Sequence, residues 1–576
     1  MGTHAVECGG LRVSFHGELY DRAELRRQLT DAGASDLSCD GALMAYGFQR
    51  WGFEPLLRRV EGMFAVAIWD PRLRTLYLAR DRIGARALYY SLTQNFLVAG
   101  SDLKAVVGAL PCRPEPEAGI LPLYLSHGFI PAPWTPFHNV WKLPPAGAAI
   151  LRERRGVLEK HELTYWKLDF SRKQRLRYAE AAEGLDQHLK TAVSRRTMSD
   201  GSLGLLCRVG GDSYALHAHD KQPVQSVEAI AAACLGEARR TAPWLADLDH
   251  GPRHEDPWKE DRLELLLDLM WSQGEPLAGL DALLAHAMSV SAARQANVIL
   301  VDHGREAWMG ASSPITSRMA AIYRHTVNQA WRERLERMST AVCSGRRVPL
   351  LVENVWSMAR AGAVPEGHVD FEPDIWRDDL RRHLLQKEVK RQSLISPRGW
   401  HARILESISV DGPEDARRAL RICGALPSDT LAGMQSVAGV DSARLRFPFL
   451  DTDLLSFLAT LPGVVVERWA TQSRARVPFQ RTVAPSRARG PDGLTRLRDY
   501  TRGRLREHIE SLLLSARTLD RGYFVAETVA ATVEQHMSGR FDHTSRIWAL
   551  VAWEHWCRMY VDEAAISEKM GGQKAA

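Results

Sequence analysis

The stretch VILVDHGREAWMG, residues 298–310, is an apolar run that ends in a polar loop. The stretch LGLLCRVGGDS, residues 203–213, has the same arrangement earlier in the chain. Apolar residues at helical spacing precede both runs. Apolar strands that follow helices and end in polar loops are typical of a parallel sheet covered by helices. Ligands of such sheets bind beyond the carboxyl ends of the strands, so we expect the loops 208–213 and 302–310 to border a binding site.

The residues that precede this region, 10–107, have a different pattern. Short apolar segments at 63–69 and 76–79 are separated by the turn residues Asp70 and Pro71, which predicts a hairpin. This spacing favours an α+β unit with an antiparallel sheet. The other elements predicted in this unit are a helix at 24–33 and a strand pair at 88–90 and 96–99.

We predict three regions along the chain. Residues 1–110 contain the α+β unit, and residues 171–576 contain the parallel sheet and a mostly helical C-terminal part. Residues 111–170 are predicted to be a connection, because proline imposes extended backbone. The prolines that suggest this are Pro131, Pro133, Pro136, Pro144 and Pro145.

Composition excludes several classes of protein. The 576 residues include 75 Lys and Arg against 69 Asp and Glu, a net charge of +6 without the basic stripe of a nucleic-acid binder. The hydrophobic content of 45% is ordinary for a globular protein, and no apolar run approaches the roughly 18 residues of a membrane helix. The first residues do not resemble a signal segment. The eight cysteines are scattered, so we predict a cytoplasmic chain without a disulfide framework or structural metal.

Several segments together resemble one known family. They are FHGELYDRAELR at 15–26, GMFAVAIWD at 62–70, LARDRIGARALYY at 78–90, GFIPAP at 128–133, KLPPAG at 142–147, FPFLD at 447–451 and GRFDH at 539–543. In order and spacing the chain resembles the glutamine-dependent asparagine synthetases over nearly its whole length.

The resemblance implies an α/β protein with two parts. The first is a truncated Ntn-type α+β domain, like that of class II glutamine amidotransferases. The second is a PP-loop ATP-pyrophosphatase-like parallel sheet with helices and a helical C-terminal part. Members of the family are often dimeric, so a homodimer or a pairing with another synthetase is compatible with the resemblance.

The resemblance assigns glutamine hydrolysis to the N-terminal domain, with a nucleophilic Cys at position 2 whose free α-amino group acts as the base. Position 2 here is Gly2, and the chain begins about half-way into the family's domain, so we expect the opening segment to be absent. Among the family's glutamine-binding elements, His16-Gly17-Glu18 replaces an expected Asn-Gly-Glu, and Asp40 persists from an expected Asp-Thr-Glu. We interpret Gly17, Glu18 and Asp40 as turn and cap residues of a scaffold and predict no glutamine hydrolysis.

In the family, a Ser-Gly-Gly-x-Asp-Ser loop holds the pyrophosphate of ATP, because its glycines let backbone N–H groups face the phosphates. Val209 stands at one glycine position and would keep phosphate away from the backbone. Arg208 could bind phosphate through its fork of donors, or fill the phosphate site and make the loop inert. A slip of one residue would instead restore both glycines and shorten the loop. The aligned residues are Arg208, Val209, Gly210, Gly211, Asp212 and Ser213.

The second loop of the family reads Gly-Asp/Glu-Gly-x-Asp-Glu-x-Phe-x-Gly. Asp302, Gly304 and Glu306 persist here, while the metal-binding Asp has become Arg305, which cannot ligate Mg²⁺. Either Glu306 or Asp302 takes its place, or Arg305 pairs with a carboxylate across an empty site. We therefore name Gly304 and Arg305 with the first loop as nucleotide-binding candidates, and Asp212 and Asp302 as Mg²⁺ candidates.

Two further departures concern catalysis. The acidic residue expected two positions before Arg446 is Arg444. An Arg-x-Lys of the family appears as Arg487-Ala488-Arg489, and in related β-lactam synthetases that lysine stabilises developing charge. Arg489 and Glu306 are thus the catalytic candidates.

Two functions remain open from the sequence. The first is an ATP-dependent amide ligase that acts without glutamine hydrolysis on small-molecule or peptide carboxylates and amines, as natural-product ligases and lasso-peptide cyclases do. The second is an inactive homologue that binds or regulates a partner. Thermal stabilisation by ATP and Mg²⁺ would separate them.

Overall fold

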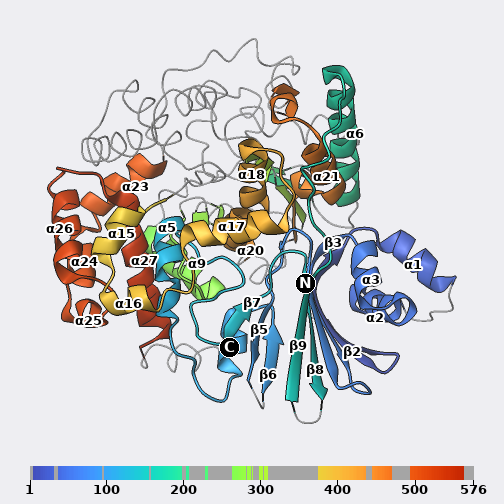
Figure 1. Ribbon diagram of the computed structural model, residues 1–576, viewed down its shortest axis with the longest axis horizontal. Coiled ribbons are helices and arrows are strands. Elements are labelled where there is room, and N and C mark those ends of the chain that lie inside the picture. The colour runs from blue at the N-terminus through green and yellow to red at the C-terminus, as the bar shows by residue number, and fades with distance from the viewer. Residues whose placement is uncertain are drawn as a thin grey trace.

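The structure is a computed structural model of the 576-residue chain (Figure 1). It describes residues 4–31, 37–93, 96–154, 157–197, 203–206, 228–230, 262–279, 298–301, 304–308, 374–435, 444–466 and 493–562, and a few positions within 282–289 and 468–469. In this part of the chain no helix is both long and apolar enough to cross a bilayer.

The N-terminal unit is built on an antiparallel sheet of six strands in the order β1-β2-β3-β4-β8-β9. The predicted hairpin is confirmed, because β3 and β4 pair antiparallel with Val66 opposite Ala79. The strands are β1 (His4–Cys8), β2 (Leu11–Leu19), β3 (Gly62–Asp70), β4 (Thr75–Arg80), β8 (Gly147–Arg154) and β9 (Val157–Thr164).

Both faces of this sheet are covered. Three helices, α1 (Arg22–Thr30), α2 (Asp40–Trp51) and α3 (Phe53–Arg59), pack on one face in a core that contains Val66. A second sheet, in the order β6-β5-β7, lies over the other face in a core that contains Ala65. Adjacent residues of a strand point to opposite faces, so β3 contributes to both layers.

The second sheet confirms the other predicted strand pair. Its strands are β5 (Tyr89–Leu92), β6 (Leu97–Gly100) and β7 (Val140–Lys142), and β5 pairs antiparallel with both neighbours. Tyr90 faces the six-stranded sheet, whereas Tyr89 belongs to the core formed with the C-terminal helices. The second sheet therefore connects the N-terminal unit with the rest of the molecule.

The predicted connection at 111–170 needs a correction. Its residues 147–154 and 157–164 form β8 and β9 of the first sheet, and β8 pairs with β4 from Thr75 opposite Arg152 onward. The prolines that suggested a connection all precede residue 147, so the sheet resumes as soon as backbone N–H donors are continuous again. The segment before β7 contains α4 (Leu103–Gly108), η1 (Ala118–Ile120) and α5 (Leu121–His127).

The second unit contains the predicted parallel sheet. Its order is β11-β10-β12-β13, and all three described pairings are parallel. The strands are β10 (Leu203–Leu206), β11 (Glu228–Ile230), β12 (Val298–Val301) and β13 (Arg444–Arg446). All four residues of β12 are buried, as expected for a strand covered on both faces.

Helices make up most of the remaining described residues. The sheet is accompanied by α6 (Tyr178–Thr197), α9 (Arg262–Gln273), α11 (Arg305–Trp308), η5 (Pro448–Leu450) and α21 (Thr452–Thr460). A middle group comprises α15 (Asp378–Leu384), α16 (Lys387–Arg391), α17 (Pro397–Ser407), α18 (Pro413–Leu420), the π-helical turn η3 (Arg421–Ala425), α19 (Leu426–Ser428) and α20 (Thr430–Gln435). The C-terminal group is α23 (Gly493–Arg502), α24 (Arg506–Leu513), α25 (Ala516–Leu519), α26 (Ala526–Met537) and α27 (Thr544–Tyr560).

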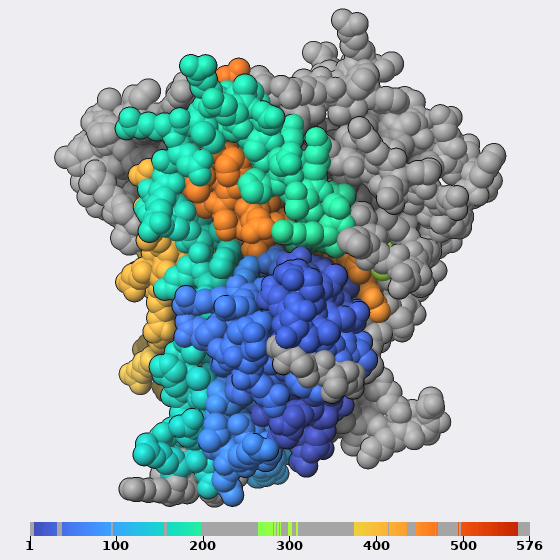
Figure 2. Space-filling model, turned by 90° about the vertical axis from the view of Figure 1, so that its right-hand side faces the viewer, coloured from blue at the N-terminus to red at the C-terminus, as the bar shows by residue number. Residues whose placement is uncertain are grey.

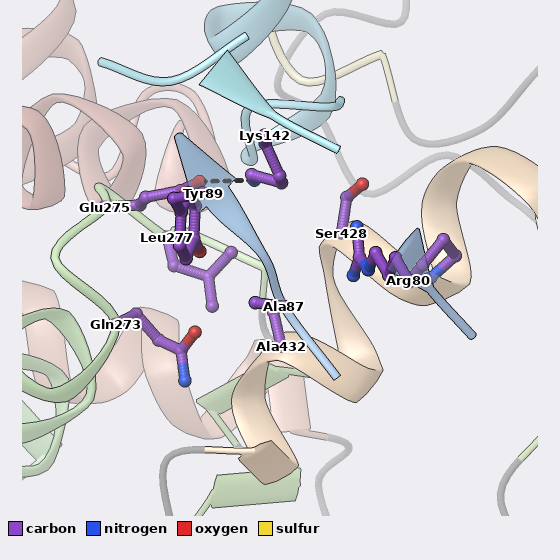
Figure 3. A pocket seen from close by; sticks show the side chains of 10 residues that line it. Arg80, Ala87, Tyr89, Lys142, Gln273, Glu275, Leu277, Ser428 and Ala432 are labelled. Carbon is purple, nitrogen blue, oxygen red and sulfur yellow. Dashed lines mark hydrogen bonds and ion pairs between the residues drawn. The ribbon is translucent and has the colours of Figure 1, made fainter. Parts of the chain in front are cut away.

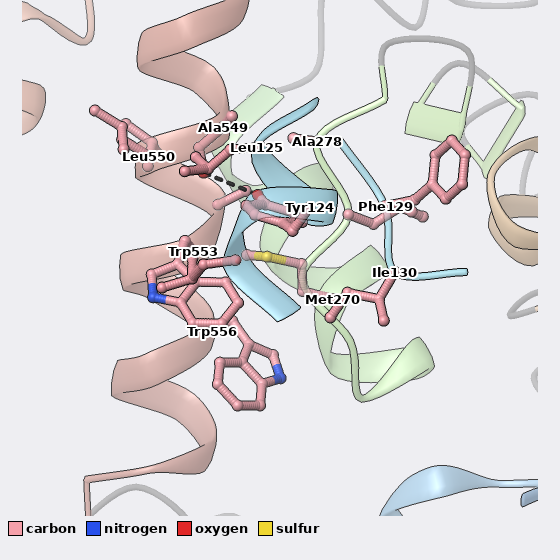
Figure 4. Close-up of a cluster of buried hydrophobic side chains, with 14 of the residues drawn as sticks. Tyr124, Leu125, Phe129, Ile130, Met270, Ala278, Ala549, Leu550, Trp553 and Trp556 are labelled. Atoms are coloured by element: carbon pink, nitrogen blue, oxygen red, sulfur yellow. Dashed lines mark hydrogen bonds between the residues drawn. The ribbon is translucent and has the colours of Figure 1, made fainter. Parts of the chain in front are cut away.

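The helix α27 joins the two units through an apolar core. Tyr124 of α5 lies against Trp553, with 5.3 Å between the ring centroids, and its hydroxyl donates to the Ala549 carbonyl (Figure 4). Met270 of α9 is buried in the same core. Residues of the first 130 positions thus pack directly on the last helix.

Acid should destabilise the C-terminal helices through His536. Its Nδ1 accepts from the His543 backbone N–H at 3.2 Å, and its Nε2 lies 3.0 Å from the Thr501 hydroxyl oxygen. Because that hydroxyl donates to the Arg498 carbonyl, Nε2 is the donor and the ring is neutral. Burial, with Arg502 nearby, lowers the pKa of His536 from 6.5 to about 4.

The unfolded chain therefore binds this proton more readily than the folded protein between those pH values, and stability falls as the pH falls from 6.5 toward 4. We expect His536→Gln to reduce the loss of melting temperature between pH 7 and pH 5. Thermal unfolding of both proteins at the two pH values measures it, and identical losses would contradict the assignment.

Candidate functional site

The carboxyl ends of two central strands meet at one edge of the parallel sheet. Leu206, the last residue of β10, lies opposite Val301, the last residue of β12. The chain after β12 turns at Gly304 and enters α11. The two loops of the predicted site therefore start from neighbouring strands, as the sequence pattern requires.

Most of the predicted site residues lie outside the described residues and stay predictions. These are Arg208, Gly210, Gly211, Asp212, Ser213, Asp302 and Arg489. Arg305 and Glu306 are described by their backbone alone, as the start of α11. Within the described residues, no three His, Cys, Asp or Glu side chains come close enough to hold a metal ion. Asp212 and Asp302 therefore stay predictions as the Mg²⁺ ligands.

Gly304 is the nucleotide-binding candidate that the structure describes fully. Its φ of +107° is a backbone conformation that other residues rarely adopt. A Cβ at this position would lie 2.4 Å from Cδ2 of Leu450, a residue of η5. Packing against Leu450 thus requires glycine here independently of any bound phosphate.

Arg444 lies at the start of β13, opposite Val298, and its side chain is exposed. Val298 is the first residue of β12, so Arg444 lies away from the loop end of the sheet. The replacement of an acidic residue by Arg444 therefore affects a different part of the unit from the loops 208–213 and 302–310.

Glu18, a residue that the resemblance connects with glutamine, is engaged by the second unit. Both of its carboxylate oxygens accept from Arg446, from Nε at 2.7 Å and from Nη2 at 2.9 Å. Both side chains are buried. Glu18 belongs to β2 and not to a turn, which corrects the prediction made from the sequence.

Two other residues of the presumed glutamine-binding set have structural contacts. Asp40 begins α2, accepts from the Leu19 N–H at 3.1 Å and pairs with Arg22 at 2.8 Å. Gly17 lies in β2, where a Cβ would approach the Met63 carbonyl oxygen to 1.9 Å. Gly17 is thus a strand residue and not a turn residue, and Asp40 is the first residue of α2, whose N-cap is Cys39, so the predicted turn and cap roles of both are corrected.

A second buried group joins the same two units. The Glu61 carboxylate accepts from Arg82 and from the Thr452 hydroxyl, each at 2.6 Å. Burial raises the pKa of the Glu61 carboxyl above its ordinary value, against the opposing effect of Arg82. A small cavity beside this group is lined by Tyr20 of the first unit and Leu450 of the second. In Figure 2 the blue N-terminal residues abut the green α6 and the orange α21 at this boundary.

Another small cavity lies between the second sheet and the helices of the second unit. Lys142 of β7 donates to Glu275 at 2.7 Å (Figure 3). It also donates to the Ile130 carbonyl at 2.9 Å. Burial lowers the pKa of Lys142, and Glu275 partly offsets this effect. The pair is therefore an internal contact between units, and the cavity that it lines is too small for a nucleotide.

The comparisons with known proteins agree with this architecture. A family model described as asparagine synthase matches residues 184–558, and one described as a glutamine amidotransferase domain matches residues 4–166. The chain belongs to the asparagine synthase family, and its fold is an Ntn-type amidotransferase domain followed by a synthase domain.

The chain is similar over its length to asparagine synthetases named as glutamine-hydrolysing. One from Bacillus subtilis is 21% identical over 591 residues, which cover 99% of this chain and 90% of the relative. A putative one from Mycobacterium tuberculosis is 22% identical over 96% of this chain and 85% of the relative. Amidase chry2 of Gibberella zeae is 31% identical, over 36% of this chain and 31% of that protein.

Proposed function

We propose that the protein is an ATP-dependent amide ligase that acts without hydrolysing glutamine. It would activate a small-molecule or peptide carboxylate as an acyl-adenylate with release of pyrophosphate, and an amine would attack the acyl carbon and displace AMP. The observation that carries the proposal is the combination of a retained parallel sheet with an engaged Glu18. The sheet brings the last residues of β10 and β12, which precede the two loops in the sequence, to one edge, while the Glu18 carboxylate is already bonded at both oxygens.

The engaged carboxylate argues against glutamine recognition in particular. To bind at Glu18, the α-ammonium group of glutamine would have to displace the Arg446 guanidinium. The buried charge of Arg446 would then have lost its carboxylate partner, which costs about 3–5 kcal/mol. An amine that enters from solvent has no such requirement. We extend the proposal to natural-product biosynthesis, because a ligase that does not depend on ammonia from glutamine can use other amines.

A second candidate is an inactive homologue that binds a partner, either a second copy or another synthetase. It is favoured by the loop sequences, in which Arg208, Val209 and Arg305 replace residues that hold phosphate and metal in the family. Under this function the parallel sheet persists as a scaffold.

Thermal unfolding tests the two candidates. For the ligase, saturating ATP should raise the melting temperature by several degrees, because a ligand at about 100 times its Kd stabilises by about 2.7 kcal/mol. Adenosine, which lacks the phosphates, is the control. No shift with ATP, with or without Mg²⁺, would favour the inactive homologue. Incubation with glutamine should release no glutamate above a sample without protein, and release would contradict the first candidate.

A further inference from the structure

The junction of the two units has matched charges. On the N-terminal side lie the carboxylates Glu18 and Asp40, and on the other side lies β13 with two arginines. Arg446 binds Glu18 through two parallel hydrogen bonds, a geometry that fixes orientation as well as distance. Burial raises the pKa of Asp40, and the positive charges of Arg22 and, to a smaller extent, Arg444 oppose this effect.

Arg446 is also fixed from within the second unit. Its Nη1 donates to the Arg196 carbonyl of α6 at 2.7 Å. Arg196 in turn donates to Asp451 at 2.6 Å, and Asp451 caps α21 by accepting from the N–H groups of Asp453 and Leu454. The Glu18–Arg446 pair is therefore part of a buried network that holds β13, α6 and α21 together.

The strand β13 is short, and its middle residue Leu445 is buried in the core of the second unit. It pairs with β12 over three residues and lies at the end of the sheet among the described strands. One residue after it, η5 begins at Pro448 and ends at Leu450. An end strand of this length depends on side-chain contacts for its register.

Leu450 connects this strand to the candidate nucleotide loop. Its side chain occupies the space in front of Gly304, which is why a Cβ there would meet it at 2.4 Å. Phe449 of the same turn packs on Trp308 of α11, with 6.1 Å between the ring centroids. A shift of η5 would therefore move both ends of the segment 304–308 that contains Glu306.

We propose that Glu18 is a positioning residue through which the N-terminal unit sets the placement of the loop 304–308, by way of Arg446, β13 and η5. The N-terminal unit then serves as a support for the synthase site instead of a source of ammonia. The structural step stands on the contacts above, and its effect on nucleotide binding rests on the proposed ligase function.

The change Glu18→Gln tests this step, because it removes the charge and keeps the size of the side chain. We expect amide hydrogen exchange in 298–308 to become at least about tenfold faster, while exchange in α27 changes little. Glu18→Asp retains the charge and should restore part of the protection. The matched control is Glu54→Gln, which breaks an exposed pair with Arg58 that does not touch the second unit.

Two outcomes would overturn the proposal. Equal acceleration in α27 and in 298–308 would mean that the pair stabilises the whole protein without positioning the loop. Unchanged exchange in 298–308 would mean that β13 holds its place without Glu18. ATP affinity is measured on the same proteins, and we expect it to fall at least about tenfold in Glu18→Gln. If the wild type binds no ATP, the proposed function fails while the exchange result still decides the positioning role.

Discussion

Replacing Gly304 by alanine is expected to lower the free energy of unfolding by roughly 3 kcal/mol, from backbone strain and overpacking together. The φ of +107° disfavours any L side chain, and the new Cβ would lie 2.4 Å from Cδ2 of the buried Leu450. The new Cβ and the Leu450 side chain cannot occupy the same space, so the same change should displace the loop 304–308 relative to η5. Denaturant unfolding measures the first effect, and hydrogen exchange in this loop measures the second.

Gly412 provides a matched control for this change. Its φ is +93°, and no atom lies within 4 Å of the position that a Cβ would take. Gly412→Ala therefore has the strain without the overpacking and should cost about 1–2 kcal/mol. The double variant Gly304→Ala with Leu450→Ala should lose less stability than the sum of the single variants, because the clash disappears. Equal costs for Gly304→Ala and Gly412→Ala, with additive effects in the double variant, would refute the packing argument.

The local parts of the fold are predictable from the sequence. A short turn connects β3 and β4, so the apolar segments and the turn residues between them suffice to identify the hairpin. That β10 and β12 are strands of a parallel sheet follows from two apolar runs that each end in a polar loop, although these runs do not identify which strands are neighbours. In both cases the pattern that determines the structure lies within the segment itself.

Pairings between distant segments are not predictable in this way. The strand β8 pairs with β4, although all three strands of the second sheet lie between them in the sequence. The proline-rich segment before β8 predicts a connection instead. The bond between Glu18 and Arg446 spans 428 positions, and neither residue has a neighbouring pattern that indicates the other. The family resemblance assigned Glu18 to glutamine, whereas its position between two packed units determines its actual partner.

The sequence predicts where the candidate site lies better than it predicts what the site binds. The resemblance identifies the loops 208–213 and 302–310, and the sheet register places their starting points at one edge. A sequence cannot say whether Arg208 and Arg305 bind phosphate or close an empty pocket, because a guanidinium group serves either purpose with the same donors. The dependence of ATP binding on salt and on Mg²⁺ distinguishes the two roles, since a closed pocket binds no ATP under any of these conditions.

The largest effect on ligand binding is expected from reverting the two loops to the family pattern, with Arg208→Ser, Val209→Gly and Arg305→Asp together. Under the proposed ligase function, the two arginines supply positive charge that Mg²⁺ supplies in the family. We therefore expect the wild type to bind ATP without Mg²⁺, more weakly as salt increases. In the reverted protein, binding without Mg²⁺ should fall at least about tenfold and become dependent on the metal, because Arg305→Asp restores a ligand.

Calorimetry with ATP, with and without Mg²⁺, measures this on the reverted protein and on a control with the same loss of charge. Arg172→Ser with Arg391→Asp is suitable, since both side chains are exposed and lie outside the loops. If charge in general attracted ATP, the control would weaken binding as much as the reversion, and the assignment of Arg208 and Arg305 would be wrong. If the wild type binds nothing and the reversion creates binding of ATP with Mg²⁺, the arginines close the pocket. That result would favour the inactive homologue, because an active ligase cannot keep its own phosphate site closed.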